Sequence, residues 1–403
     1  SKPRFCAPAK PCTDSATIKM FFYLSKFLLE RSADTSWSES LSFLRLFRYI
    51  TFRSAGAAVT ALVLSLWLGP IIIAWLKRLK FGQHYVDKAE EAGGLMGRTT
   101  DKKGTPTMGG ILIIAVMDVT ALLWAQWNTL VQLTLLSVVV LAGLGFYDDY
   151  AKITQQSNKG AASHVKLWVQ AALAVFIAIY LWRMPSTYRL ISDVMVPFVK
   201  HPVLTGSIGA VFGLILTTLT VMGSSNAVNL TDGLDGLAIG CTLIVSFIFL
   251  VLTYIAGNFR AAEYLQVPYV AGAGELTVFC AAMIGAGLGF WWFNCHPAQV
   301  FMGDTGSLAL GGALGIVAVL IHQPLLLVIA GGVFVMEALS VMLQTGYFKW
   351  SRKRTGQGKR IFLMAPLHHH FEKKGWHESK VVTRFYILGI LCGVVALSTL
   401  KIR

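Results

Sequence analysis

The chain has 403 residues, of which 55% are hydrophobic and 14% are charged, and its mean hydropathy is +0.61. A soluble domain carries roughly 45–50% apolar and ~25% charged residues, so this composition argues against a soluble globule, a disordered chain and a fibrous repeat. The net charge of +15 would suggest nucleic-acid binding in a soluble protein, whereas in a membrane protein it indicates basic cytoplasmic loops. The six scattered cysteines contain no CxxC pair, which disfavours a disulfide framework or a structural zinc site.

The first residues are interpreted separately from the rest. Residues 1–19 are polar filler ahead of Met20 and are interpreted as a vector remnant or a disordered extension, so that residues 20–403 form a single polytopic membrane domain. The apolar stretch 21–29 is too short to span a bilayer. Residues 41–53 mix apolar side chains with Arg45, Arg48 and Arg53, which predicts a helix lying on the membrane surface.

Ten apolar segments follow, several of them close to the lower limit of the ~20 residues that a span requires. The eighth and ninth are separated only by His322 and Gln323, so a tight hairpin and a broken helix both fit there. No internal repeat is visible. The sequence therefore predicts an all-α integral membrane protein with about ten transmembrane helices, at residues 55–76, 110–124, 130–146, 167–182, 204–222, 237–256, 276–293, 307–321, 324–343 and 385–400.

The loops differ in charge according to their parity. The loops after the odd-numbered segments carry 20 Lys and Arg residues, and the other internal loops carry 4. The positive-inside rule therefore predicts cytoplasmic odd-numbered loops and places both termini outside. The basic N-terminal region disagrees with this orientation.

The polar motifs lie in the same odd-numbered loops, which predicts one composite site on the cytoplasmic face. The motifs are KKGTPTMGG (102–110), DDYAK (148–152), NAVNLTDGLDG (226–236), NCHPAQVFMGDTGS (294–307) and PLHHHFE (366–372). They contain five acids: Asp148, Asp149, Asp232, Asp235 and Asp304. Crowded carboxylates near a low-dielectric boundary are costly unless they are paired or bind a metal. Oxygen ligands with lysines nearby favour Mg²⁺ and a diphosphate.

Each motif also has a purely structural interpretation. Adjacent Asp148 and Asp149 diverge by about 100° on a helix and could be a membrane-end acidic cap. Asn226, Asn229, Asp232 and Asp235 recur every third residue, so they cannot share one helix face, and a loop or a broken helix is favoured over a simple turn. The GDTGS string could cap a helix with its own side chains. Three consecutive histidines make a poor closed metal site. The acids inside predicted spans, Asp118 and Glu337, suit either function or helix packing.

The motifs resemble the phospho-N-acetylmuramoyl-pentapeptide-transferases, within the polyprenyl-phosphate N-acetylhexosamine-1-phosphate transferase superfamily. The resemblance runs from about Phe43 to the C-terminus and is most specific in NLTDGLDGL and HHHFE. It implies transfer of phospho-MurNAc-pentapeptide from UDP-MurNAc-pentapeptide to undecaprenyl phosphate, which yields lipid I and UMP in peptidoglycan synthesis. It also implies ten transmembrane helices in the bacterial cytoplasmic (inner) membrane, a Mg²⁺ requirement, a homodimer and no nucleic-acid partner.

The resemblance also assigns roles to residues of this chain. Asp304 would be the metal ligand and would act with the catalytic pair Asp148 and Asp149. Upstream of Lys102 the chain has HYVDKAEEAGGLMGRTTD (84–101) in place of the family's Arg-x-Asp-Gly-Pro stretch, so no contact is carried over there. The implied substrate-binding residues are Lys102, Lys103, Thr107, Lys152, Lys166, Asn226, Asn229, Asp232, Asp235, Asn294, Phe301, Gly303, Gln344, His368, His369 and His370.

Two mechanisms and two other functions stay open on the sequence. The lipid phosphate could attack the donor directly, or an aspartate could attack first and give a phospho-enzyme. A sister UDP-N-acetylhexosamine transferase is one alternative function, against which HHHFE argues. A cation transporter is the other, although transporters place their acids near the membrane midplane.

Overall fold

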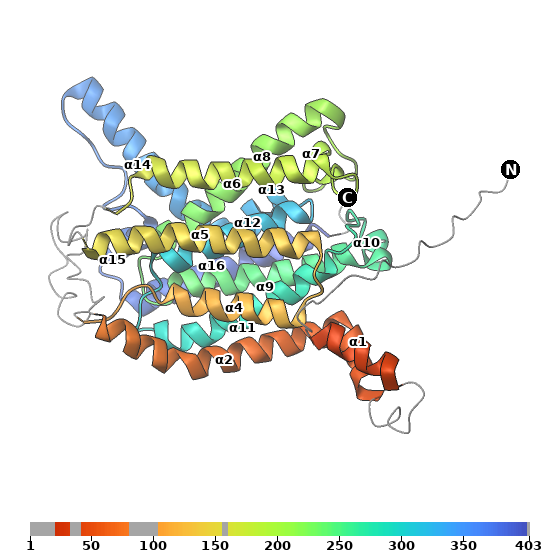
Figure 1. The fold of residues 1–403 in the computed structure, drawn as a ribbon. Helices are drawn as coiled ribbons and strands as arrows, with labels where there is room; N and C mark the ends of the chain where they lie inside the picture. The colour runs from red at the N-terminus through yellow and green to blue at the C-terminus, as the bar shows by residue number, and fades with distance from the viewer. Residues whose placement is uncertain (1–20, 33–41, 80–103, 155–159, 401–403) are drawn as a thin grey trace.

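The structure is a computed structural model that describes residues 21–32, 42–79, 104–154 and 160–400. The regular structure within these ranges is helical (Figure 1). The elements are α1 (Phe21–Ser32), η1 (Ser42–Arg48), α2 (Ile50–Arg78), α4 (Gly110–Trp124), α5 (Thr129–Thr154), α6 (Ser163–Arg183), α7 (Arg189–Ser192), α8 (Gly206–Thr231), α9 (Leu237–Gly257), α10 (Phe259–Leu265), α11 (Gly274–Asn294), α12 (Gly303–Leu320), α13 (Pro324–Ala330), α14 (Gly332–Thr355), α15 (Leu367–Lys373) and α16 (Glu378–Ser398).

Each of the ten predicted apolar segments is helical, so the predicted fold class is confirmed. Eight described helices are long and apolar enough to cross a bilayer, and α13 with α14 makes a ninth when the two count as one bent span. The remaining segment is α4, whose 15 residues extend only about 22 Å at 1.5 Å per residue. A hydrocarbon core is about 30 Å thick. Ten is therefore an approximate count of spans.

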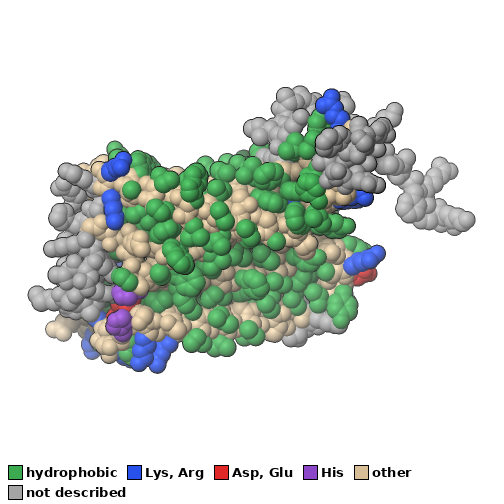
Figure 2. Space-filling model, turned by 90° about the horizontal axis from the view of Figure 1, so that it is seen from below, with side chains coloured by type: hydrophobic (Ala, Val, Ile, Leu, Met, Phe, Trp, Pro, Cys, Tyr) green, Lys and Arg blue, Asp and Glu red, His purple; other side chains and the backbone are tan. Residues whose placement is uncertain are grey.

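The core of the bundle is built around α11 and α12. In their most apolar windows, 78% of α11 and 89% of α12 is buried, against 28% of α2 and of α8. The helix α12 packs against α5 and α8, while α11 packs against α2 and α9. The sequence of α12 is rich in Gly and Ala, and small residues allow helices to approach closely in a membrane. The outer helices expose apolar side chains instead, and Figure 2 shows this apolar surface with Lys and Arg near its two ends.

The ambiguity between the eighth and ninth segments is settled by two breaks. The helix α12 ends at Leu320 and α13 begins at Pro324. A second break at Gly331 bends α14 away from α13 by 86°. In Figure 1 α14 consequently projects out of the bundle.

The prediction of a surface helix over residues 41–53 was wrong in its last part. A 3₁₀ helix covers Ser42–Arg48, and α2 begins at Ile50. Arg53 lies inside α2 and is 1% exposed, because it forms an ion pair with Glu275 of α11. Residues 1–19, interpreted as a vector remnant or a disordered extension, lie outside the described residues. The helix α1 has 12 residues and is too short to span a bilayer.

Candidate active site

Three of the five motif acids come together where α5 meets α12. Asp148 and Asp149 lie near the end of α5, and Asp304 is the second residue of α12. Carboxylate oxygens of the three lie within 4.8 Å of one another. The approach depends on Gly145, one turn earlier on α5, because a Cβ there would overlap the backbone carbonyl of Asp304. These three acids, with Lys152 and Lys166, are called the carboxylate cluster below.

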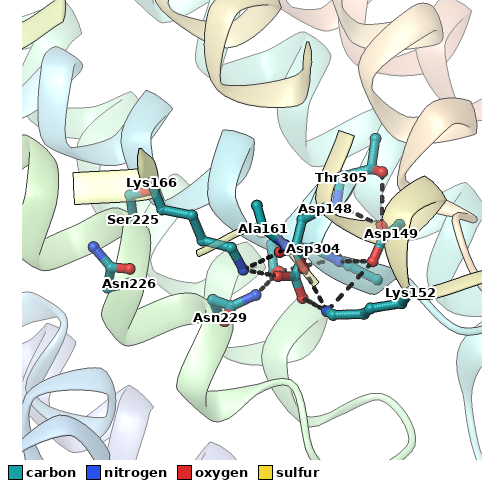
Figure 3. Close-up of polar contacts among 12 residues, drawn as sticks. Asp148, Asp149, Lys152, Ala161, Lys166, Ser225, Asn226, Asn229, Asp304 and Thr305 are labelled. Atoms are coloured by element: carbon teal, nitrogen blue, oxygen red, sulfur yellow. Dashed lines mark hydrogen bonds and ion pairs between the residues drawn. The ribbon is translucent and has the colours of Figure 1, made fainter. Parts of the chain in front are cut away.

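Two lysines hold the carboxylate cluster together (Figure 3). The Nζ atom of Lys152 lies 2.6 Å from Asp148 Oδ2 and 3.1 Å from Asp304 Oδ1. The Nζ atom of Lys166, on α6, lies 2.8 Å from Asp148 Oδ1 and 2.6 Å from Asp304 Oδ2. Asp148 and Asp304 thus share both ammonium groups. Without such partners, carboxylates this close in a buried place would not all stay ionised.

The adjacent Asp148 and Asp149 have different partners. Asp149 accepts hydrogen bonds from the backbone N–H groups of Asp304 (3.1 Å) and Thr305 (2.9 Å) and from the Thr305 hydroxyl (2.8 Å). It therefore satisfies donors at the start of α12 that no residue of α12 itself satisfies. The structural interpretation of GDTGS as a self-capping string was wrong, since α12 has no side-chain cap bond of its own at its N-cap. Asp148 instead accepts the Ala161 N–H at 2.7 Å.

Exposure distinguishes Asp304 from its neighbours. Its side chain is 14% exposed, whereas those of Asp148 and Asp149 are 1% and 2% exposed. Asp304 is thus the carboxylate of the cluster that a ligand can reach most easily. This placement supports the sequence-based choice of Asp304 as the metal ligand, which stays a prediction.

The asparagine and aspartate residues of NAVNLTDGLDG divide between a helix and a turn. The helix α8 continues to Thr231, so Asn226 and Asn229 are helical. Asn229 donates to Ser307 Oγ at 2.9 Å, next to the carboxylate cluster, while Asn226 donates to Gln170 Oε1 at 2.7 Å. The following turn, residues 232–236, is called the Asp232–Gly236 turn below. Sequence reasoning missed Gln170, because a Gln inside an apolar helix carries no motif, and it considered Ser307 only as part of the GDTGS cap.

Asp232 and Asp235 have different surroundings within this turn. Burial raises the pKa of Asp232 to about 8, and the nearby charges of Asp304 and Asp149 act in the same direction. Asp235 Oδ2 lies 3.1 Å from His296 Nδ1, and the Asp235 N–H donates to Glu378 Oε1 at 2.8 Å. Asp235, His296 and Glu378 form a second group with ligand atoms within 4.8 Å. No sequence signal pointed to Glu378, which lies 143 residues away from Asp235.

The loops before α4 and α12 are joined through their backbones. The Gly109 and Gly110 N–H groups donate to the carbonyls of Phe301 and Met302 at 2.8 and 2.9 Å, and the Phe301 N–H donates to Pro106 O at 2.8 Å. Gly303 lies against both Asp149 and the buried Thr107, which places Gly303 and Thr107 beside the carboxylate cluster. Asn294 accepts the Gly236 N–H at 3.2 Å and joins this loop to the Asp232–Gly236 turn. The predicted contacts Lys102 and Lys103, and the departure at 84–101, lie outside the described residues.

The three histidines have three different environments. His368 is fully buried, and burial lowers the pKa of its imidazole. His369 is 14% exposed, with Nδ1 2.8 Å from Glu372 Oε2. His370 Nδ1 accepts the Leu363 N–H at 3.1 Å. Gln344 binds the same loop, since it accepts the N–H groups of Ile361 and Phe362. His369 and His370 are thus both partly exposed, whereas His368 is enclosed.

The chain resembles known proteins along most of its length. The glycosyl transferase family 4 profile matches residues 131–322, and signature 1 of the phospho-N-acetylmuramoyl-pentapeptide-transferases matches residues 102–114. The phospho-N-acetylmuramoyl-pentapeptide-transferase of Methylacidiphilum infernorum is 50% identical over 91% of this chain and 98% of that protein. Those of Desulfotalea psychrophila and Opitutus terrae are 50% and 48% identical over 89% of this chain, and 95% and 96% of their own lengths. The chain therefore belongs to the phospho-N-acetylmuramoyl-pentapeptide-transferase family of multi-pass membrane proteins.

Proposed function

We propose that the protein transfers phospho-MurNAc-pentapeptide from UDP-MurNAc-pentapeptide to undecaprenyl phosphate, producing lipid I and UMP. The observation that carries the proposal is the carboxylate cluster at one end of membrane-crossing helices, in a chain 50% identical to a relative named for this transfer. A lipid phosphate lies at the depth where such helices end. Lysines facing carboxylates at that depth suit two anionic substrates.

The residues present fit Mg²⁺, the ion that we propose as cofactor. Mg²⁺ prefers oxygen ligands and takes one or two carboxylates together with substrate phosphates. The cluster offers three carboxylates with oxygens within 4.8 Å of one another, and these outnumber the two lysines facing them. Asp304, the most exposed, would hold the ion. Bound there, Mg²⁺ would neutralise negative charge on the diphosphate.

The reaction proposed for this site is a direct displacement. An oxygen of the lipid phosphate attacks the β-phosphorus of the donor, the bond from that phosphorus to the bridging oxygen breaks, and UMP leaves with the bridging oxygen. A phosphate monoester has a second pKa of about 6, so the attacking group needs little help from a base. Lys152 and Lys166 would reduce repulsion between the two anions.

The surroundings of the aspartates favour direct attack over a phospho-enzyme. Both oxygens of Asp149 accept hydrogen bonds from the first residues of α12. Asp148 is 1% exposed and is bound by both lysines. An attack on phosphorus by either carboxylate would have to displace these partners. We therefore assign Asp148 to holding the lysines and Asp149 to holding the start of α12, so that Asp304 faces the substrates.

The proposal is tested by UMP release from UDP-MurNAc-pentapeptide with purified protein, with and without polyprenyl phosphate. We expect release that depends on the lipid phosphate and on Mg²⁺. UDP-N-acetylglucosamine is included as a competing donor, and its preferential use would identify a sister transferase instead. Release without any lipid acceptor would contradict a direct transfer.

We further propose a homodimer in the bacterial cytoplasmic (inner) membrane, with the carboxylate cluster facing the cytoplasm. The orientation rests on the 20 Lys and Arg residues of the odd-numbered loops against 4 in the others. Two reporters test it, one that is active only in the cytoplasm and one that is active only outside the membrane. Inserted at Gly356, only the cytoplasmic reporter should be active, and fused after Arg403, only the external reporter should be active. A C-terminal fusion that is active in the cytoplasm would contradict the orientation.

A further inference from the structure

Glu337 is a fully buried acid that the proposed reaction does not use. It lies in α14 five residues after Gly332, just past the 86° bend that separates α13 from α14. Its exposed fraction is 0%, and so is that of His368 in α15. An ionisable side chain in such a place is costly unless its partners compensate. The contacts of Glu337 therefore indicate what it does.

Those contacts are directed at one residue. Glu337 Oε1 accepts the backbone N–H of His368 at 3.2 Å, and the same oxygen lies 3.2 Å from His368 Nδ1. Glu337 Oε2 and both ring nitrogens of His368 have no hydrogen-bond partner among the described residues, so the 3.2 Å approach of Nδ1 to Oε1 is a contact without hydrogen-bond geometry. The carboxylate thus binds the main chain of His368 at the start of α15 and lies against its ring. Buried polar atoms without partners are rare in folded proteins, which favours a role beyond stability.

His368 in turn packs beneath the Asp232–Gly236 turn. A Cβ added at Gly233 would overlap His368 Nε2, so the ring touches the backbone of the turn. Gly233 stands between Asp232 and Asp235, two of the residues expected to bind the nucleotide. A contact path consequently runs from Glu337 through His368 to this turn.

We propose that Glu337 is a positioning residue that holds His368 under Gly233 and so fixes the Asp232–Gly236 turn for donor binding. The proposal rests on the proposed function for the identity of the donor. Glu337 itself touches no reacting atom. Its loss should therefore weaken binding of the UDP-linked donor selectively and leave binding of the lipid acceptor unchanged.

The test compares Glu337→Ala with Glu337→Gln in UMP release, with donor and lipid acceptor varied separately. Gln keeps an oxygen that can accept the His368 N–H, so its donor KM should stay within ~3-fold of wild type. Ala removes that acceptor, so the donor KM should rise at least ~10-fold with kcat and the acceptor KM within ~3-fold. Equal changes in both KM values, or an unchanged donor KM for Glu337→Ala, would overturn the proposal.

Glu275 supplies a matched control at the other end of the bundle. It is also buried and ion-paired, and its partners Arg53 and Gln126 lie at the end of the bundle away from the carboxylate cluster. Glu275→Ala should lower the thermal midpoint without changing the donor KM selectively. If Glu337→Ala behaves in the same way, Glu337 is only structural and the proposal falls.

A second pair of variants tests the path if Glu337→Ala does not fold. Gly233→Ala places a methyl group against His368, so its donor KM should rise. Under the proposal, His368→Ala and Gly233→Ala disturb the same contact, so the donor KM of the double variant should be no higher than that of the more affected single variant. A double variant whose donor KM rises by the product of the two single effects would overturn the proposed path. A wild-type protein that releases no UMP would overturn the proposed function itself, which separates the two failures.

Discussion

Buried charges lie at both ends of the bundle, but the two sets differ in balance. At the end away from the motifs, the Arg53 guanidinium meets the two oxygens of Glu275, at 2.7 Å for the Nη2–Oε1 pair, and Gln126 N–H donates to the same carboxylate. At the motif end, three carboxylates face two lysines. The first set pairs one cation with one anion and joins α2 to α11. Among the described residues the second set has one carboxylate more than it has lysines, which suits the binding of a further cation such as Mg²⁺.

The largest expected effect tests the unbalanced end. Asp304→Asn should lower UMP release by at least ~1000-fold, or ~4 kcal/mol of transition-state stabilisation. The thermal midpoint should change little, because Asp149 and not Asp304 satisfies the donors at the start of α12. Excess Mg²⁺ should restore part of the loss if metal affinity is the main defect.

UMP release across a Mg²⁺ titration and thermal unfolding in detergent check this prediction. Glu263→Gln, an exposed acid in α10, is the control and should match wild type. A folded Asp304→Asn protein with near-normal turnover and an unshifted Mg²⁺ optimum would exclude Asp304 as the essential ligand.

The balanced end should respond in stability and not in chemistry. Arg53→Ala leaves Glu275 buried without its cation, which typically costs about 3–5 kcal/mol. Turnover per folded molecule should stay within ~2-fold, since the polar partners of Arg53 are Glu275 and the Trp124 carbonyl, away from the carboxylate cluster. Thermal unfolding with a parallel assay of UMP release measures both. A selective loss of turnover at an unchanged thermal midpoint would contradict the assignment of Arg53 to stability.

Asp149 should affect both stability and turnover, so its variants test whether the two effects are linked. Asp149→Ala removes the three hydrogen bonds to Asp304 and Thr305 and should destabilise the protein by about 1–2 kcal/mol, as for a lost helix cap. Turnover should fall as well, because Asp304 starts the same helix. Asp149→Asn, which retains one oxygen acceptor, should recover part of both losses. Equal turnover in the Ala and Asn variants would show that the cap does not position Asp304.

The smallest expected effect concerns the histidine run. His369→Ala should reduce transfer by ~10-fold, or ~1.4 kcal/mol, with little change in the thermal midpoint because His369 is partly exposed. His370→Ala is the comparison: it removes the acceptor of the Leu363 N–H and should act mainly on loop stability. Near-normal kcat/KM for His369→Ala would reassign the run to a structural turn.

Sequence periodicity predicted most of the fold, because each span buries an apolar stretch that is contiguous in the chain. The segment at 110–124 matches α4 at both ends. Polar interruptions were harder to interpret. Of the favoured alternatives at 226–236, a loop or a broken helix, the structure has the broken helix: α8 continues to Thr231 and α9 begins at Leu237. The sequence could not place the break, because Asn226 and Asn229 stay helical through bonds to Gln170 and Ser307 on neighbouring helices. Arg53 was assigned to the membrane surface because its partner is 222 residues away.

The sequence by itself determined the class of membrane protein and predicted a site of acids gathered on alternate loops, because hydropathy and motif content are local properties of the chain. Only the tertiary structure decided which partners each of those residues has and how deeply it is buried. Adjacent Asp148 and Asp149 have the same local chemistry, yet one holds lysines from α5 and α6 and the other holds the first turn of α12. Likewise His368 is buried beneath Gly233 while His369 is partly exposed. Burial and partner choice depend on helices that are distant in sequence, and no local pattern records them.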